Sequence, residues 1–552
     1  MDSITYILFT AIILLIIIAC KISSNNKKER IEKQRIIDLQ QSAIDALNRE
    51  HSSLTQQLKK FESDLEVYRT ALRDLEKERD FYKNTVDASA DLNTPDIEPE
   101  TDHAELDPEQ TVVCKEMENT NNNFFITGKA GTGKSFLLSA FRSRTSKSHI
   151  VLAPTGIAAL NVGGATLHSA FGYYNLVNLN IDTISDDTIR LKTEKRMVLQ
   201  RVQTIIIDEI SMVRADVFDK IDRILQVINH NTLPFGGKQI LLFGDLFQLP
   251  PVAVREELEY LNHKYGGVHF FCSSAYKKSD FGFRELTINH RQKEDAAYFN
   301  LLNRVRDGTI TSADIKTLNN RVSHDLSVYD RFTTLLPTKA EVEQLNSSHI
   351  RQLNSQEYVY QAKIVRDKYP DVNHSIEAIF PITSSLRLKK GVLVMMVAND
   401  PERRWVNGTL GIVSDLSQNR ISVAINKQVY DITPHEFSEQ EVTYEDDKLV
   451  YENILTVLQF PVIPAYAITI HKSQGQTYQN IVCDINRCFA DGQAYVALSR
   501  CASLNGLHLK NPITRGSIRV NRNVLDFYHA NAYPIQTTSF DPPISQIPAP
   551  PL

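Results

Sequence analysis

The chain has 552 residues, 42% of them hydrophobic, and a net charge of −5 at neutral pH. This length allows about three to five domains with ordinary cores, and six cysteines without any C-x-x-C pair exclude a disulfide scaffold or a zinc ribbon. Nine acidic residues and no basic one lie between Lys83 and Lys115, so the rest of the chain is net positive, which is compatible with nucleic-acid binding.

An uncharged run rich in Ile and Leu occupies residues 4–20. Its 17 residues are close to the minimum that spans a bilayer. Several Lys and Arg residues follow the run, and the positive-inside rule then places the rest of the chain in the cytoplasm. We predict a transmembrane helix over residues 1–22 and a single-pass membrane protein with its ATPase body in the cytoplasm; a cleaved or buried segment is the alternative.

From about Lys27 to Asn84 there is no Pro or Gly, and two sets of residues repeat every seven positions with an offset of three. The first set is Leu47, Leu54, Phe61, Tyr68, Leu75 and Tyr82, and the second is Ile37, Ile44, His51, Leu58, Leu65, Leu72 and Arg79. Two such ladders form the seam of a coiled coil. We therefore predict a long coiled-coil helix over residues 27–84 that self-associates; a helix lying on the rest of the chain is the alternative.

Acidic residues and prolines dominate residues 85–105, a composition that predicts a disordered linker. At the other end of the chain, residues 511–552 form a C-terminal extension that is rich in proline from Gln536 onward. We expect this last part to be a solvated tail, or else a ligand for a domain that binds proline motifs.

A nucleotide-binding motif lies at residues 126–135, ITGKAGTGKS, between a strand signal and the start of an apolar helix. It fits the pattern G-x-x-x-x-G-K-S/T, in which glycines let backbone N–H groups point at phosphate oxygens. Lys134 can reach the β- and γ-phosphates, and the Ser135 hydroxyl can bind Mg²⁺. The predicted cradle consists of Gly128, Lys129, Ala130, Gly131, Thr132, Gly133, Lys134 and Ser135.

Polar side chains follow two further apolar strands. Asp208 and Glu209 come directly after Ile205–Ile207, and Gln248 follows a strand at Ile240–Phe243. Asp208 can hold Mg²⁺, Glu209 can take a proton from the attacking water, and Gln248 can bridge the γ-phosphate to a moving part. These spacings predict a nucleoside triphosphatase.

Two other segments have residues suited to single-stranded nucleic acid, which binds small polar groups and exposed aromatic rings. The candidate residues for contact with single-stranded nucleic acid are Thr155, His168, Phe171, His471, Lys472 and Ser473. Arg500, in the segment at residues 494–501, follows a strand-like run and could reach the γ-phosphate across a cleft.

Together with LDPEQ at 106–110, LPFGG at 233–237 and TINHRQ at 287–292, these segments resemble in their order the PIF-type DNA helicases of superfamily one, which are related to RecD. The resemblance runs from about residue 106 to residue 509. It implies that Gln110 contacts the adenine base and that Arg291 contacts the γ-phosphate.

The resemblance implies an α/β fold with two RecA-like P-loop domains, each a parallel sheet flanked by helices, at residues 106–275 and 276–510. ATP would bind between them with Mg²⁺. A small β-barrel would be inserted in the second domain at about residues 350–464, where the pattern alternates as in strands. A short wedge element would lie between about residues 172 and 200.

The function implied is that of an ATP-dependent helicase that moves 5′ to 3′ on single-stranded DNA and unwinds forked duplex DNA in replication, recombination or repair. Two alternatives stay open from the sequence. One is a membrane-tethered ATPase, stimulated by nucleic acid, that serves as a scaffold without unwinding. The other is a membrane-associated ATPase of the AAA type that remodels proteins and is indifferent to single-stranded DNA.

Overall fold

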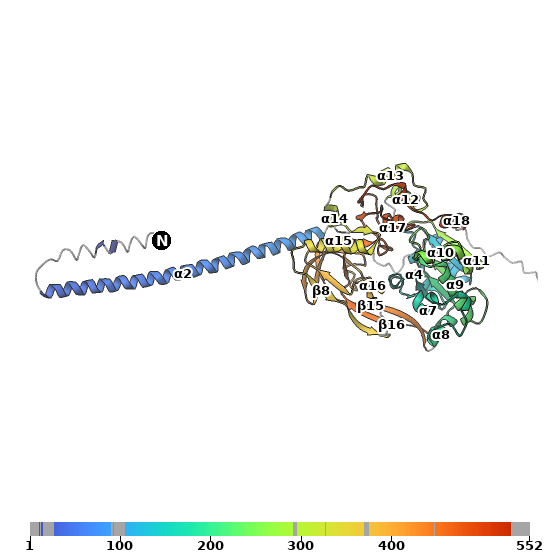
Figure 1. The fold of residues 1–552 in the computed structure, drawn as a ribbon, viewed down its shortest axis with the longest axis horizontal. Coiled ribbons are helices and arrows are strands. Elements are labelled where there is room, and N and C mark those ends of the chain that lie inside the picture. The colour runs from blue at the N-terminus through green and yellow to red at the C-terminus, as the bar shows by residue number, and fades with distance from the viewer. Residues whose placement is uncertain are drawn as a thin grey trace, which may run out of the picture. The chain divides into compact units, whose positions relative to one another are not determined.

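The computed structural model describes residues 10–11, 13–14, 27–89, 92, 105–290, 295–325, 327–368, 375–445 and 448–531. The chain divides into two compact units, residues 1–83 and residues 84–552. Figure 1 shows a long helix in the first unit and a mixture of helices and sheets in the second unit.

A long helix, α2 (Lys27–Ala88), accounts for most of the described part of the first unit. It can form because its 62 residues include neither Pro nor Gly. Both heptad ladders lie on its surface with large exposed fractions, for example 71% for Phe61 and 60% for Leu72. The expected helix is present, whereas its pairing with a second copy stays a prediction.

The prediction of a membrane anchor has to be corrected. Of residues 4–20, only Thr10, Ala11, Ile13 and Leu14 belong to the described residues, so most of the predicted span lies outside them. Among the helices of the described ranges, none is both long and apolar enough to cross a bilayer, because the long helix α2 carries charged residues throughout. The prediction of a single-pass membrane protein is therefore wrong.

The first lobe, residues 105–290, is built on a parallel six-stranded sheet in the order β3-β2-β4-β5-β1-β6. Its strands are β1 (Asn123–Gly128), β2 (His149–Ala153), β3 (Ala165–Thr166), β4 (Thr204–Ile207), β5 (Gln239–Phe243) and β6 (Phe281–Leu286). β4 and β5 are buried along their whole length, as is usual for parallel strands with both faces covered. The carboxyl ends of the neighbours β4, β5 and β1 therefore meet at one edge of the sheet.

Helices connect these strands and pack around the sheet (Figure 1). They are α3 (Pro108–Asn119), α4 (Lys134–Arg144), α5 (Gly156–Asn161), α6 (Leu167–Phe171), α7 (Tyr173–Val177), α8 (Thr193–Arg201), α9 (Ala215–Ile228), α10 (Arg255–Tyr265) and α11 (Ser274–Lys278). The predicted domain boundary after residue 275 is wrong by one strand, because β6 pairs with β1 along six residues and completes this sheet.

The second lobe, residues 295–352 and 465–510, has a parallel four-stranded sheet in the order β18-β7-β19-β20. Its strands are β7 (Thr334–Leu336), β18 (Ala467–Thr469), β19 (Ile481–Cys483) and β20 (Leu507–Leu509). Its helices are α12 (Ala296–Arg306), α13 (Ser312–Asn319), α14 (Ser327–Arg331), α15 (Lys339–Gln352) and α17 (Gln493–Leu498). The strand-like run at residues 494–501 is thus mostly helical, because a short, fully buried apolar run has no periodicity that separates strand from helix.

An antiparallel β domain, residues 358–464, is inserted in the second lobe between α15 and β18. It contains a five-stranded sheet in the order β14-β13-β12-β11-β17, a three-stranded sheet in the order β15-β16-β9, and the pair β10-β8. Its elements are β8 (Tyr358–Gln361), β9 (Lys363–Asp367), α16 (Ile376–Ile379), β10 (Ser385–Leu388), β11 (Leu393–Met396), β12 (Leu410–Ser417), β13 (Arg420–Ile425), β14 (Gln428–Ile432), β15 (His435–Glu445), β16 (Lys448–Gln459) and β17 (Val462–Pro464).

The start of the expected linker is ordered. Helix α2 continues to Ala88, and Thr85 and Ser89 are buried within the second unit. The Ser89 Oγ accepts the backbone N–H of Lys427 at 2.8 Å. The expectation of disorder from residue 85 is therefore wrong for these residues, and residues 93–104 lie outside the described ranges.

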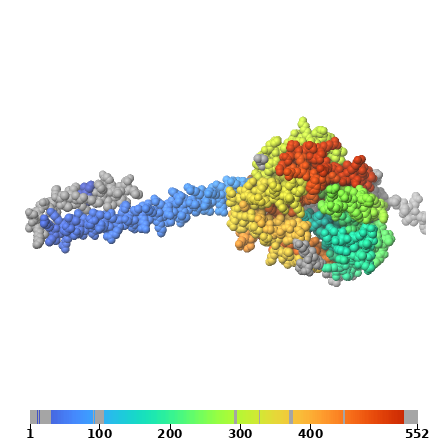
Figure 2. Space-filling view, in the orientation of Figure 1, coloured from blue at the N-terminus to red at the C-terminus, as the bar shows by residue number. Residues whose placement is uncertain are grey.

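The C-terminal extension contains a helix that the sequence analysis did not predict, α18 (Arg522–Asn531). It packs against the first lobe, where the Phe527 ring stacks on Phe271 with 4.4 Å between centroids. In Figure 2 the red surface of this C-terminal part adjoins the green surface of the first lobe. The proline-rich tail falls in residues 532–552, outside the described residues.

Candidate active site

The phosphate loop joins β1 to α4 at the carboxyl edge of the first sheet. The Lys134 side chain turns back over this loop, and its Nζ donates to the carbonyl oxygens of Gly128 and Lys129 at 2.7 and 3.2 Å. Burial lowers the pKa of Lys134, an effect that the nearby Asp245 opposes. A bound phosphate would offer this ammonium group stronger acceptors than the two carbonyl groups do.

Two glycines allow the loop to take this shape. Gly133 begins the turn into α4 with φ at +75°, and a Cβ there would lie 2.5 Å from the Gln110 Nε2. At Gly128, a Cβ would lie 2.6 Å from the Thr132 Oγ1. The loop therefore stays close to its neighbours, and residues 128–135 fit a nucleoside triphosphate.

The start of α3 and the segment after β6 lie over the same loop. Asp107 caps α3 in a reciprocal capping box with Gln110, whose Nε2 lies 3.4 Å from the Thr132 carbonyl oxygen. The His290 Nε2 lies 2.8 Å from Asp107 Oδ2, and the His290 N–H donates to the Gly131 carbonyl at 2.9 Å. Gln110 is thus next to the phosphate loop, in a place from which it can contact a nucleotide.

Asp208 and Glu209 follow β4 and are partly buried. Burial raises the pKa of Asp208, and burial together with the negative charge of Asp208 raises the pKa of Glu209. Glu209 also has a left-handed backbone conformation, with φ at +49°, which is uncommon outside glycine. A carboxylate with a raised pKa is suited to accept a proton from water, and the hydroxyl of Ser135 with the carboxylate of Asp208 is a donor pair that suits Mg²⁺.

A residue that the sequence analysis missed, Gln474, joins the two lobes at this point. Its Nε2 donates to Glu209 Oε2 at 2.9 Å and to Gln248 Oε1 at 3.0 Å. Gln474 lies in the turn after β18 of the second lobe, whereas Glu209 and Gln248 belong to the first lobe. The only signal for it in the sequence is its place two residues beyond Lys472.

Two more side chains of the second lobe reach this site. The Tyr495 hydroxyl accepts the Ala130 N–H at 3.3 Å, and burial raises the pKa of Tyr495 to about 12. Arg500 is 2% exposed and donates to carbonyl groups of its own lobe, while its positive charge opposes the rise in the pKa of Glu209 that burial causes. Arg291 lies outside the described residues.

The candidates for nucleic-acid contact in the first lobe divide into three cases. Phe171 has an exposed fraction of 0%, so the expectation of an exposed ring at this position is wrong; α6 turns it into the core. Thr155 caps α5 by accepting the Ala158 N–H at 3.2 Å. His168 is half-buried, and its ring lies 5.3 Å from that of Tyr173, which is 64% exposed. Tyr173, rather than Phe171, therefore offers an aromatic face to solvent.

In the second lobe, Ser473 is buried and donates from its Oγ to the Ile470 carbonyl at 2.8 Å, which is a packing role rather than a contact surface. Its neighbours His471 and Lys472 are partly exposed. Lys472 lines a cavity of about 370 Å³ between α15, β10 and β18. The charged residues around this cavity are Lys339, Glu343, Arg351, Glu357, Glu377, Arg387 and Lys472.

Comparison with protein families gives two matches. A model described as PIF1-like helicase matches residues 105–316, and one described as DNA helicase Pif1, 2B domain, matches residues 371–416. Among known proteins, the chain is similar to the ATP-dependent DNA helicase Pif1 of Bdellovibrio bacteriovorus, with 35% identity over 434 residues that cover 77% of this chain and 92% of the relative.

Two solved structures show the same similarity in three dimensions. The crystal structure of Bacteroides sp Pif1 in complex with ADP-AlF4 has a TM-score of 0.69 and 37% identity, covering 78% of this chain and 97% of that one. Bacteroides Pif1 bound to ssDNA has a TM-score of 0.56 and 36% identity, with the same coverage. The two lobes with their parallel sheets and the inserted β domain thus form an α/β helicase fold.

Proposed function

Because the chain belongs to the PIF1-like helicase family, we propose that it is an ATP-dependent DNA helicase that moves along single-stranded DNA and separates forked duplex DNA. The contact that supports this most directly is the Gln474 bridge. It connects Glu209 and Gln248 of the first lobe to a turn that also carries His471 and Lys472. A change at the ATP site therefore has a short physical route to a candidate DNA contact.

Hydrolysis requires a proton acceptor, cations for the phosphate charge, and an orienting group. We assign proton acceptance to Glu209, whose pKa is raised by burial, and charge neutralisation to Lys134. Gln248 orients the γ-phosphate and bridges it to the second lobe through Gln474, and Arg500 adds positive charge from that lobe. Arg291, outside the described residues, stays a candidate for contact with the γ-phosphate. Mg²⁺, held by Ser135 and Asp208, would stabilise the developing charge on the phosphates when bound.

The path for single-stranded DNA is proposed to pass the cavity beside Lys472. Lys339, Arg351 and Arg387 add positive charge to its wall, which suits a phosphate backbone. Thr155, His168 and His471 stay candidates for the same path, with Tyr173 added as an exposed ring. Phe171 and Ser473 are excluded from it by their burial.

The first test is strand displacement by the full chain on forked duplexes with either a 5′ or a 3′ single-stranded tail. We expect ATP-dependent displacement from the 5′-tailed fork, and none with Lys134→Ala. Turnover of ATP that single-stranded DNA stimulates, without displaced strand on either fork, would instead support the scaffold function. Turnover indifferent to single-stranded DNA would rule out the helicase.

The second test concerns the DNA path. We expect Lys472→Ala to weaken binding of single-stranded DNA about tenfold and to reduce the slope of log affinity against log salt by about 1. Lys316→Ala is the matched control, because Lys316 is exposed on α13, away from this cavity. Equal affinities for the two variants would remove Lys472 from the path. The readout is fluorescence anisotropy of a labelled oligonucleotide at several salt concentrations.

We also propose that the chain self-associates through α2. The support is the row of exposed apolar side chains that repeats along this helix at coiled-coil spacing. Such a row covers more area than isolated surface leucines do, and a second copy of the helix would bury it. Neither matched family model reaches α2, so this association would be a property added to the helicase body.

A further inference from the structure

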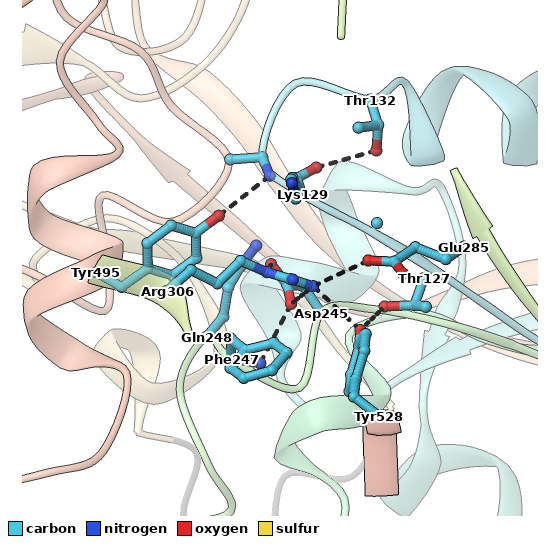
Figure 3. A network of polar contacts seen from close by, with 12 residues as sticks. Thr127, Lys129, Thr132, Asp245, Phe247, Gln248, Glu285, Arg306, Tyr495 and Tyr528 are labelled. Carbon is cyan, nitrogen blue, oxygen red and sulfur yellow. Dashed lines mark hydrogen bonds and ion pairs between the residues drawn. The ribbon is translucent and has the colours of Figure 1, made fainter. Parts of the chain in front are cut away.

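Beneath the phosphate loop, four elements that are far apart in the chain meet in one buried polar network (Figure 3). β1 contributes Thr127, the loop after β5 contributes Asp245, α12 contributes Arg306 and α18 contributes Tyr528. None of these four residues is more than 6% exposed. Charged groups at this depth persist only when each has a partner.

Arg306 is the centre of the network. Its Nη2 donates to Asp245 Oδ1 at 3.0 Å, and its Nε lies 3.5 Å from Asp245 Oδ2. Its guanidinium lies 4.1 Å from the centre of the Phe247 ring and 5.1 Å from that of the Tyr528 ring. Burial alone would lower the pKa of Arg306, but Asp245 raises it above its ordinary value. Arg306 therefore stays charged and neutralises Asp245.

The Tyr528 hydroxyl contacts the same Arg306 nitrogen that donates to Asp245. The Arg306 Nη2 donates to this hydroxyl at 3.2 Å. Because a guanidinium cannot accept, the hydroxyl oxygen is the acceptor, and its proton is free to bond the Thr127 Oγ1 beside it. Thr127 is the residue before Gly128, where the phosphate loop starts, so Tyr528 ties Arg306 to the strand that carries this loop.

The charge of Asp245 also acts on a second cation, Lys134. This negative charge acts on Lys134 against the effect of burial, and the positive charge of Arg306 acts on Lys134 in the opposite sense. The two cations therefore share the carboxylate of Asp245, and Arg306 also lies 3.7 Å from Glu285 Oε1 on β6. With Arg306 bound through two nitrogens, the Lys134 Nζ stays over the loop on Gly128 and Lys129, where phosphates would bind.

We propose that Tyr528 and Arg306 are positioning residues for ATP hydrolysis: Tyr528, on the C-terminal helix, holds Arg306 on Asp245, so that Asp245 does not draw Lys134 away from the phosphates. The inference rests on the proposed hydrolysis of ATP at Lys134. It gives α18, which lies beyond the residues matched by the two family models, a direct part in setting the rate of the motor.

The hydroxyl can be tested without removing the helix. Phe527 stacks on Phe271 at 4.4 Å, and the Tyr528 ring lies 4.7 Å from the Phe247 ring, so a phenylalanine at position 528 keeps the ring contacts. The matched control is Tyr360→Phe, which removes another buried tyrosine hydroxyl, one that donates to the Ser417 carbonyl at 2.6 Å in the β domain.

The experiment measures steady-state ATP turnover of the full chain with saturating single-stranded DNA. We expect Tyr528→Phe to lower kcat about tenfold, the effect of one hydrogen bond to a charged group, with KM for ATP changed less than twofold. Tyr360→Phe should keep the kcat of the wild type while changing Tm about as much as Tyr528→Phe does. In an Asp245→Asn background, where no carboxylate competes for Lys134, Tyr528→Phe should have little further effect.

Three results would overturn the proposal: a kcat within twofold of wild type for Tyr528→Phe, an equal loss for Tyr360→Phe, or the same tenfold loss in the Asp245→Asn background. Thermal unfolding of each variant separates these results from misfolding, since every variant compared must unfold cooperatively. Wild-type turnover by Lys134→Ala would be a different failure, because it would show that hydrolysis does not occur at this loop at all.

Discussion

At the scale of single residues, the side-chain amide of Gln474 makes two hydrogen bonds to the other lobe. Both hydrogens of its Nε2 are used, one on the Glu209 carboxylate and one on the Gln248 carbonyl. Both acceptors are on the first lobe, so one amide group from the second lobe fixes their separation. Hydrogen bonds to a charged group are stronger than those between neutral groups, and the bond to Glu209 is therefore the more important of the two.

We expect Gln474→Ala to lower DNA-stimulated kcat about tenfold or more, because Glu209 and Gln248 would lose their common donor and their alignment. Gln479→Ala is the control, since this glutamine is exposed on the same connection between β18 and β19. A coupled assay of ATP turnover measures both variants. Turnover of Gln474→Ala within twofold of wild type would show that the bridge is incidental.

His269 is a second residue that matters at this scale, because its burial affects how the stability of the fold depends on pH. It is 1% exposed and stacks on Phe271 with 5.2 Å between the rings and 9° between their planes. Its Nδ1 has no hydrogen-bond partner within the described ranges of the chain. Burial lowers the pKa of His269 to about 4. The unfolded chain, in which the pKa of histidine is about 6.5, therefore binds a proton at pH values where the folded chain does not.

The sign of the pH effect follows from this difference. As pH falls from about 6.5 towards 4, proton uptake by unfolded His269 lowers the free energy of unfolding, by roughly 2 kcal/mol at about pH 5. We expect His269→Phe, which keeps a stacked ring, to flatten the loss of stability between pH 7 and 5. Urea unfolding at several pH values measures it. Parallel pH profiles for variant and wild type would contradict the assignment.

At the scale of elements, charged and polar groups form part of the contact between the β domain and the first lobe. The hairpin of β15 and β16 lies against α8, where Lys195 Nζ is 2.7 Å from Glu441 Oε1. The Glu441 side chain is 2% exposed, and Lys368 lies 3.7 Å from it on the other side. Beside this pair, the Arg201 guanidinium lies 4.6 Å from the centre of the Tyr444 ring.

Removing one partner of a buried ion pair leaves the other charge uncompensated. We therefore expect Glu441→Ala to lower the free energy of unfolding by about 3 kcal/mol. Glu259→Ala, which breaks a pair with Arg255 on the surface of α10, should change it by less than about 0.5 kcal/mol. Chemical denaturation of both variants tests the difference, and similar small effects would show that Glu441 is solvated in solution.

At the scale of the whole molecule, the helicase body and α2 differ in the exposure of their apolar residues. The body buries its apolar residues in extended cores, whereas α2 exposes a regular row of them. Apolar surface that repeats at 3.5 residues along a helix is removed from water most completely by a second helix with the same repeat.

We expect the full chain to form dimers or higher oligomers that Leu58→Asp with Leu65→Asp dissociates, because two carboxylates would then face each other on the seam. Gln56→Asp with Ser63→Asp is the control; both of these residues lie on the outer face of the heptad and are exposed. Sedimentation velocity measures the mass of each. A monomeric wild-type chain at micromolar concentration would contradict the proposed pairing.

The sequence by itself determined the features whose parts are close together in the chain. The phosphate loop needs a strand, glycines at fixed spacing and a helix within ten residues, and residues 126–135 provide them without help from elsewhere. The same holds for Asp208 and Glu209 at the end of β4, and for the helical character of α2. These features depend on local backbone geometry and on period, which a sequence displays directly.

Only the tertiary structure decided how distant groups meet and which way a side chain turns. Phe171 and Tyr173 are both aromatic and almost adjacent, yet one is buried and the other exposed, because the packing of α6 against the sheet selects between them. Gln474 reaches Glu209 across 265 positions of sequence, and Tyr528 reaches Thr127 across 401. Contacts of this kind depend on how whole lobes pack, a free-energy balance over hundreds of residues that no local pattern encodes.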